Sequence, residues 1–167
     1  MSNPAEGTVI RLLTLDVDGT LTDGGVYLDG EGNEFKRFDI RDGMGLVRLR
    51  KAGVMLAIVS GRASAATDLR ARALGIECVY NGVTDKLPVL QALAAELGLA
   101  AGEVAYMGDD VNDIDSLRWA GLSMAPCDAR PEVLAVVDWV APVGGGRGAV
   151  REAAEKILSL NGETMRP

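Results

Sequence analysis

The chain of 167 residues is long enough for one domain with a substantial core, and we expect a single domain over residues 1–167. Hydrophobic residues make up 48% of the sequence and aromatic residues only 4%, which predicts an aliphatic core of the kind found around buried parallel sheets. A net charge of −7 without a basic cluster argues against nucleic acid or an anionic membrane as a partner.

Further features of the sequence limit which catalytic groups and metal ligands the protein can use. The sequence has no histidine, which excludes Ser-His-Asp triads, Cys-His pairs and His-ligated zinc, and its carboxylates are hard oxygen ligands of the kind that Mg²⁺ prefers. The isolated Cys78 and Cys127 are expected as small core residues. Residues 1–8 lack a signal-peptide pattern and no apolar run has membrane-spanning length, so we expect a cytoplasmic protein.

The first predicted element is a buried strand in the apolar run Val9–Leu15, and two carboxylates, Asp16 and Asp18, follow it directly. For both side chains to converge on one site the chain must leave the strand at this point, and Gly19 gives it the freedom to turn. The two charges would repel each other without a cation or a shared proton. The pattern therefore predicts a metal site in which one aspartate is a nucleophile and the other a proton donor.

Beyond this point the pattern predicts an α/β fold. Gly24–Asp39 reads as a β-hairpin, because turn residues at 29–33 separate two alternating segments, and Asp42 is expected to cap a helix that runs to Lys51. Strands and helices then alternate, which predicts a mostly parallel, doubly wound sheet. The expected strands are 54–60, 78–80, 104–107, 122–124 and 139–140. Two expected helices span Lys86–Leu97 and Ala149–Leu160. Of the others, one ends at Gly75, one ends at Trp119 and a short one begins at Pro131.

Further polar residues follow these later strands in a recognisable order. Ser60 precedes Gly61 at the end of one strand, and Lys86 stands at a helix start. The acidic segment 108–113, which contains Asp109, Asp110 and Asp113, follows strand 104–107. Each piece alone has an ordinary interpretation as a turn residue, a solvated helix start or a capped helix end. Together with Asp16-Val17-Asp18-Gly19-Thr20 they resemble the motifs of the haloacid dehalogenase-like phosphatases. The resemblance implies a Rossmann-like fold and Mg²⁺-dependent hydrolysis of phosphomonoesters.

The resemblance also implies a role for each residue. Asp16 would be the nucleophile that forms an aspartyl-phosphate, and Asp18 the general acid that protonates the leaving alkoxide and later activates water. Mg²⁺ would bind the Asp16 carboxylate, the Asp18 backbone carbonyl and Asp109, with Asp110 and Asp113 as supporting residues. The phosphoryl oxygens would be held by two further side chains, Ser60 and Lys86.

No stretch between these motifs is long enough for a cap domain, so we expect an open site beside a protruding hairpin. Segments along nearly the whole chain, among them Ser60-Gly61-Arg62 and Gly145–Gly148, resemble the capless subgroup that hydrolyses phosphates of 3-deoxy sugar acids in lipopolysaccharide precursor synthesis. Members of this subgroup are homotetramers whose hairpins form a shared barrel and help to close neighbouring sites. The resemblance implies the same assembly for this chain.

The subgroup also implies which residues bind the sugar acid phosphate. They are Asp39, Ile40, Arg41, Asp42, Gly43, Arg62, Arg70 and Lys86. Cations of this kind suit an anionic substrate in so acidic a chain. Arginine at position 62 favours the octulosonate 8-phosphate branch over the nonulosonate 9-phosphate branch. Two departures stand out, because Val47 replaces a basic residue of some members and the tail after Leu160 is short.

Two alternatives of other classes remain open at this stage. A phospho-acceptor signalling domain also combines aspartates, Ser or Thr, Lys and Mg²⁺ on a doubly wound sheet, but its phosphorylated aspartate follows the third strand rather than the first. A catalytically weak phosphatase-like oligomerisation domain is the second alternative. The intact set of Asp16, Asp18, Ser60, Lys86 and Asp109 argues against it.

Overall fold

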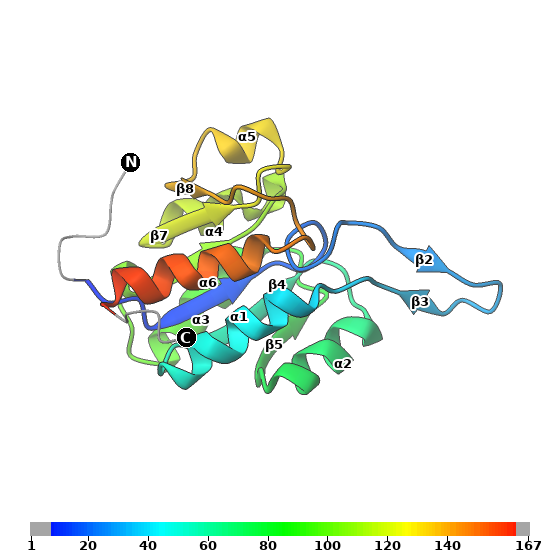
Figure 1. The fold of residues 1–167 in the computed structure, drawn as a ribbon, viewed down its shortest axis with the longest axis horizontal. Coiled ribbons are helices and arrows are strands. Elements are labelled where there is room, and N and C mark those ends of the chain that lie inside the picture. Colours follow the sequence, from blue (N-terminus) through cyan, green and yellow to red (C-terminus); the bar gives the residue numbers. More distant parts are fainter. Residues whose placement is uncertain (1–7, 163–167) are drawn as a thin grey trace.

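A six-stranded parallel sheet forms the centre of the computed structural model, which describes residues 8–162 (Figure 1). Residues 1–7 and 163–167 of the expected domain lie outside the described residues. The strand order is β5-β4-β1-β6-β7-β8, and every pair within it is parallel. The strands are β1 (Leu12–Leu15), β4 (Met55–Ser60), β5 (Cys78–Asn81), β6 (Val104–Met107), β7 (Leu122–Ala125) and β8 (Trp139–Val140).

Helices cover both faces of this sheet, as the doubly wound prediction requires. One core cluster joins Leu13 and Leu15 of β1 to α1, α2 and α6, and the other joins Leu12 of β1 to α3, α4 and α5. Alternate residues of the central strand thus point to opposite faces. The helices are α1 (Ile40–Lys51), α2 (Ala65–Leu74), α3 (Lys86–Glu96), α4 (Ile114–Trp119), α5 (Pro131–Leu134) and α6 (Ala149–Leu160), with short 3₁₀ turns at Ala101–Glu103 and Val111–Asp113.

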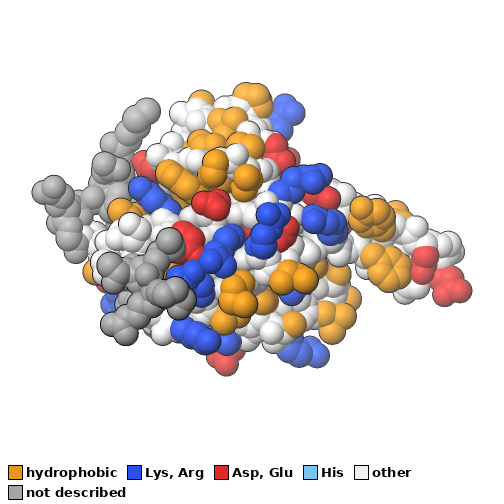
Figure 2. All heavy atoms as spheres, viewed as in Figure 1, with side chains coloured by type: hydrophobic (Ala, Val, Ile, Leu, Met, Phe, Trp, Pro, Cys, Tyr) orange, Lys and Arg blue, Asp and Glu red, His pale blue; other side chains and the backbone are white. Residues whose placement is uncertain are grey.

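A two-stranded antiparallel hairpin, β2 (Tyr27–Leu28) and β3 (Glu34–Phe35), projects from one end of the sheet (Figure 1). The Asp29 carboxylate closes its turn by accepting hydrogen bonds from the amides of Glu31 and Asn33. The ladder is shorter than the expected segments 26–28 and 34–38. Hydrophobic side chains lie on the surface of part of the hairpin, whose tip carries acidic groups (Figure 2), and Tyr27, Leu28 and Phe35 are 57%, 67% and 57% exposed.

Two local predictions are corrected by the structure. Asp39, not Asp42, caps α1, because its carboxylate accepts from the Arg41 amide at 2.8 Å. Asp42 instead lies buried within the first turn and accepts from the Arg151 amide of α6 at 2.9 Å. Cys127 is exposed rather than part of the core, because it lies in the loop after β7. Across residues 8–162, none of the helices combines the length and the apolar character needed to cross a membrane.

Candidate active site

The candidate site lies at the carboxyl edge of the sheet, between β1 and β6. From β1 the chain winds outward through β4 and β5, and it then returns to β6 on the other side of β1. Ligands of open α/β sheets bind at such a switch point, because the helices that follow the two adjacent strands lie on opposite faces and leave a crevice. Asp16 directly follows β1, and Asp109 follows β6 by two residues. The topology therefore brings together carboxylates that are distant in the sequence.

The turn after β1 is held from both sides. The Asp16 amide donates to the Met107 carbonyl of β6 at 3.0 Å. Gly19 has a φ of 93°, and a Cβ at this position would collide with the Asp109 carboxylate. Gly145 packs against the other side of the turn, where a Cβ would collide with the Gly19 carbonyl. The turn expected at Gly19 is therefore confirmed, and a second glycine makes room for it.

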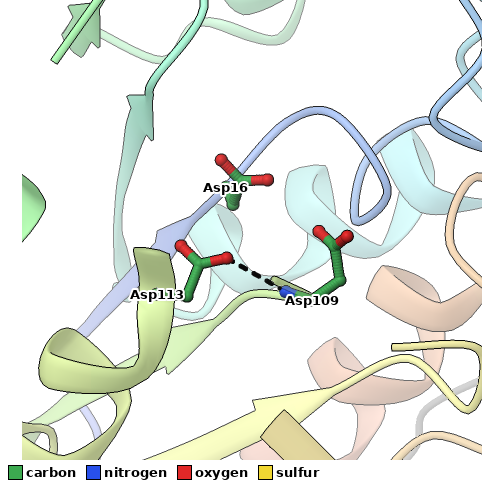
Figure 3. Close-up of side chains that lie close together, drawn as sticks. All are labelled: Asp16, Asp109 and Asp113. Carbon is green, nitrogen blue, oxygen red and sulfur yellow. Dashed lines mark hydrogen bonds between the residues drawn. The ribbon is translucent and has the colours of Figure 1, made fainter. Parts of the chain in front are cut away.

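Three carboxylates converge at this turn (Figure 3). Asp16, Asp109 and Asp113 each offer an oxygen, and these oxygens lie within 4.8 Å of one another. Asp109 is oriented by the Thr20 hydroxyl, which donates to its Oδ1 at 2.8 Å. Asp113 is oriented by backbone, because its Oδ2 accepts from the amides of Asp109 and Asp110 at 3.1 and 3.2 Å. Carboxylate oxygens in this arrangement suit a hard divalent cation such as Mg²⁺.

Lys86, the first residue of α3, supplies the cation inside this group. Its Nζ donates to Asp16 Oδ1 at 2.6 Å and to Asp113 Oδ1 at 2.7 Å, with 1% of its side chain exposed. The Tyr106 hydroxyl of β6 donates to the same Asp113 oxygen at 2.7 Å. Both oxygens of Asp113 are thus engaged by protein donors. Asp16 and Asp109 keep more free acceptor capacity, so they are the better candidates for a metal ligand.

Two of the carboxyl groups, those of Asp16 and Asp109, hold protons more tightly than usual. Burial raises the pKa of Asp16 to about 6, and the charge of Asp113 adds to this effect. Burial also raises the pKa of Asp109 to about 8, with a further contribution from the charge of Asp16. Burial lowers the pKa of Lys86, but the charges of Asp16 and Asp113 outweigh it and the net pKa is raised. The site therefore has an excess of negative charge that one lysine does not balance, and a divalent cation would relieve it.

A cleft of about 440 Å³ opens onto Asp16. It is lined by Asp16, Asp18, Gly61, Arg62, Val83, Thr84, Asp110 and Asn112. The Asp18 carboxylate accepts two hydrogen bonds from Lys36 of the hairpin, at 2.7 and 2.9 Å. Arg62 is held by the hairpin too, because its Nε and Nη2 donate to Glu34 Oε2 at 2.9 and 2.6 Å. The hairpin thus reaches the cleft of its own chain.

The expected residues do not all meet at this cleft. Ser60 is buried, and its hydroxyl donates to the Arg62 carbonyl at 3.1 Å. Arg70 lies beside the start of α1, where its Nη2 donates to the Asp39 carbonyl at 3.2 Å and its guanidinium stacks over Phe38 at 5.6 Å. None of the residues 39–43 or Arg70 is among the described residues that line the cleft. Their role in substrate binding stays a prediction.

Three contacts at the site were not predicted from the sequence. Tyr106 lies in an apolar strand, so the sequence predicts only that it is a core residue. No sequence pattern indicates that its hydroxyl bonds to Asp113. Glu34 and Lys36 belong to the hairpin, and their spacing of two residues indicates only that they share one face of a strand. A cation near Asp18 could have been expected from its charge, but not the residue that supplies it.

The fold and the acidic site define a class, and the chain belongs to the haloacid dehalogenase-like hydrolases. The profile of the haloacid dehalogenase-like hydrolase family matches residues 76–150. The curated relative KdsC of Escherichia coli K12, a 3-deoxy-D-manno-octulosonate 8-phosphate phosphatase, is 40% identical over 159 residues, which cover 95% of this chain and 85% of the relative. At this level of similarity the chain belongs to the family of these phosphatases.

Solved structures agree with this assignment. The phosphatase of the same name from Moraxella catarrhalis, crystallised with magnesium, phosphate and KDO, has a TM-score of 0.90 and 41% identity, covering 92% of this chain and 88% of that chain. The Yersinia pestis phosphatase has a TM-score of 0.93 and 39% identity, covering 97% and 88%. The predicted Rossmann-like fold is confirmed, and the chain is a phosphatase.

Proposed function

We propose that this protein hydrolyses 3-deoxy-D-manno-octulosonate 8-phosphate to the free sugar acid and phosphate, with Mg²⁺, in lipopolysaccharide precursor synthesis. The observation that carries the proposal is the buried Asp16, which faces Lys86 and lies beside Asp109 at the switch point of the sheet. The relatives described above bear the name of this activity, and one of them was crystallised with magnesium, phosphate and the sugar acid. Both findings support the same substrate.

The carboxylate of Asp16 is the proposed nucleophile. It attacks phosphorus and the bond to the sugar oxygen breaks, giving an aspartyl-phosphate and an alkoxide that takes a proton from Asp18. Asp18 then accepts a proton from the water that attacks the intermediate, which releases phosphate and restores Asp16. Lys86 already contacts Asp16 at 2.6 Å, so it is placed to hold a phosphoryl oxygen as negative charge develops there. We assign Ser60 to a second phosphoryl oxygen.

The metal ligands in this proposal are the Asp16 carboxylate, the Asp18 backbone carbonyl and Asp109. Magnesium bound there supplies positive charge against the phosphoryl oxygens and the nucleophile. Asp113 has both oxygens engaged by Lys86, Tyr106 and backbone amides, which supports a positioning role for it. Asp110 is exposed at the cleft and is assigned to the same supporting shell.

Substrate selection is assigned to Arg62, which lines the cleft, and to Arg70 with residues 39–43, which do not line it. We also propose a homotetramer in which the hairpins meet. One observation supports this assembly: the hairpin exposes the apolar side chains of Tyr27, Leu28 and Phe35, although isolated two-stranded hairpins are marginal in water. Light scattering should report a tetramer, and a stable, active monomer would exclude this arrangement.

A cytoplasmic location stays a prediction that cell fractionation tests.

The direct test is a substrate panel with Mg²⁺, ranked by kcat/KM. The panel contains 3-deoxy-D-manno-octulosonate 8-phosphate, a nonulosonate 9-phosphate and simple sugar phosphates. We expect the octulosonate ester to rank first and the Asp16→Asn variant to be inactive on every member. A higher rank for the nonulosonate ester would move the chain to that branch. No turnover of any phosphomonoester would favour the catalytically weak oligomerisation domain.

A further inference from the structure

An alternating chain of charges links the hairpin to the cleft. Arg62 of the cleft pairs with Glu34 at 2.6 Å, Glu34 lies 3.5 Å from Lys36, and Lys36 pairs with Asp18 of the cleft at 2.7 Å. Glu34 and Lys36 are two residues apart in the sequence, at and just beyond β3, so an extended backbone points both side chains the same way. The hairpin thus places one acidic and one basic group against its own active site.

Lys36 differs from the surface lysines and arginines in its burial. Its side chain is 0% exposed, although it belongs to a hairpin whose neighbouring residues are largely open to solvent. Lysine is almost never fully buried unless it is paired, because its ammonium group loses hydration. By contrast, the surface pair Arg130–Glu132 is 62% and 53% exposed, and such pairs contribute little to stability. A buried ion pair does not by itself show a gain in folding stability. The role of Lys36 is therefore better explained by how it orients its acidic partners.

Asp18 depends on this lysine for its orientation. Among residues 8–162, the side-chain hydrogen bonds to the Asp18 carboxylate come from Lys36 alone. The other carboxylates of the site are held by the body of the protein: Asp109 by Thr20, Asp113 by Tyr106 and backbone amides. Asp18 is 25% exposed and directly precedes Gly19, which has a positive φ, so without a partner its side chain would sample several rotamers.

We propose that Lys36 is a positioning residue for the acid–base step, because it holds the Asp18 carboxylate in the cleft through a two-hydrogen-bond contact delivered by the hairpin. The proposal rests on the proposed function, in which Asp18 transfers the proton. It gives the hairpin a catalytic duty in its own chain, in addition to any contact with a neighbouring subunit. Glu34 completes the arrangement by holding both Lys36 and Arg62, so that one strand end fixes the acid–base group and the substrate-facing arginine together.

A double-mutant cycle tests whether Lys36 acts through Asp18. The proteins are the parent, Lys36→Met, Asp18→Asn and the double variant, all as full chains with Mg²⁺ and 3-deoxy-D-manno-octulosonate 8-phosphate. Misplacing a reacting group by about 1 Å costs up to about 100-fold, so Lys36→Met should lower kcat about 10–100-fold with little change in KM. In the Asp18→Asn background the same change should cost less than about threefold, because residues that act as a unit are not additive.

Lys36→Arg keeps a cation at this position and should recover most of the loss. Lys51→Met is the matched control, because it removes the same charge from the exposed end of α1 far from the hairpin, and it should leave kcat unchanged. Lys36→Gln, which removes the charge and keeps a donor on a side chain one bond shorter, provides a second neutral variant. If both neutral variants lose the parent's melting temperature and oligomeric state, Lys36 is structural and the inference is wrong.

The remaining outcomes of the mutant cycle also distinguish a wrong role for Lys36 from a wrong function of the protein. An equal loss in the parent and Asp18→Asn backgrounds would show that Lys36 acts independently of Asp18, and unchanged kcat in Lys36→Met would show that it does not act at all. Either result overturns the positioning role while the parent stays active. Failure of the proposed function gives a different pattern, in which the parent does not turn over the substrate or Asp16→Asn remains active.

Discussion

Two buried lysines join acidic side chains at the site, and they come from different parts of the molecule. Lys86 bridges Asp16 and Asp113, whose side chains are 8% and 0% exposed, at the edge of the sheet. Lys36 bridges Asp18 and Glu34, whose side chains are 25% and 17% exposed, at the base of the hairpin. The same kind of ion pair therefore occurs twice. Packing of the core determines the position of Lys86, whereas the position of Lys36 depends on the hairpin.

The difference separates two tasks of the site. The core arrangement holds Asp16, the proposed nucleophile, and β1, β6 and α3 determine it by packing. The hairpin arrangement holds Asp18, the proposed acid–base group, and its position depends on a two-stranded ladder that packs little of its own surface. We infer that phosphoryl binding is built into the single chain, whereas alignment for proton transfer is sensitive to whatever stabilises the hairpin.

The largest expected effect is the loss of the nucleophile. Asp16→Asn should abolish turnover, because an amide cannot attack phosphorus as a carboxylate does. Asp18→Asn should leave a residual rate about 10²–10⁴-fold below the parent, the usual contribution of a positioned acid–base group. Phosphate release at saturating substrate measures both. Normal turnover in Asp16→Asn would exclude the assigned nucleophile.

The two lysines should differ in what they contribute to folding. Lys86→Met leaves Asp113 buried without its cation and should destabilise the metal-free protein by about 3–5 kcal/mol. Lys36→Met should cost much less, because Asp18 is partly exposed and can be hydrated by solvent. Denaturant unfolding in EDTA compares the two variants with the parent. Equal losses would contradict the distinction between a core-fixed and a hairpin-fixed pair.

Magnesium should stabilise the core arrangement, and more so as pH rises. At a hundredfold excess over Kd, mass action gives about 2.7 kcal/mol. Burial raises the folded-state pKa of Asp16 to about 6 and of Asp109 to about 8, from the ordinary value of 3.8. In the metal-free protein, the stability from these raised pKa values is therefore fully present below pH 3.8 and is lost as pH rises through about 6 and about 8.

Bound metal favours the charged carboxylates, so the gap between melting temperatures in Mg²⁺ and in EDTA should widen between pH 5 and about pH 8, the upper of the two raised pKa values. Thermal melts at several pH values measure this gap. Sodium chloride at the same ionic strength is the control for general ionic effects. Identical midpoints with Mg²⁺ and with EDTA at pH 8 would mean that these carboxylates do not share a metal ion.

A smaller effect is expected from Arg62 and Arg70, the arginines proposed to select the substrate. Arg70→Ala should lower kcat/KM for the sugar acid phosphate about 10–100-fold, because a charge-assisted contact contributes about 1.5–3 kcal/mol. Arg62→Ala should act in the same direction, since Arg62 lines the cleft. p-Nitrophenyl phosphate has no carboxylate, so its hydrolysis should change little in either variant. An equal loss on both substrates would assign these arginines to the catalytic centre or the fold.

The sheet and the carboxylates could be predicted from the sequence because each depends on a local pattern. Apolar runs indicate the six strands, and the residues at the carboxyl ends of parallel strands gather at one edge of the sheet. Asp16, Asp109 and Asp113 could for this reason be expected at one place. The helix Ala149–Leu160 was predicted to the residue, because its apolar periodicity and flanking glycine leave little choice.

The contacts that were missed depend on long-range geometry. Asp39 and Asp42 are both good caps, and only the burial of Asp42 against Arg151 of α6 decides between them. The pairing of Lys36 with Asp18 requires the chain just after β3 to lie against the cleft, which no local pattern encodes. Nor does helical spacing reveal that Arg70 turns toward α1 rather than toward the cleft.

The measurement that tests the nucleophile most directly is a rapid acid quench followed by peptide mass spectrometry. The parent is quenched within one turnover, and the Asp18→Asn variant within one of its own slower turnovers, because this change slows both the formation of the aspartyl-phosphate and the attack of water on it. We expect the added mass of one phosphoryl group on the peptide that contains Asp16, formed within one turnover and absent from the Asp16→Asn protein. A phosphoryl group on any other residue, or a burst of phosphate without a labelled peptide, would contradict a covalent role for Asp16.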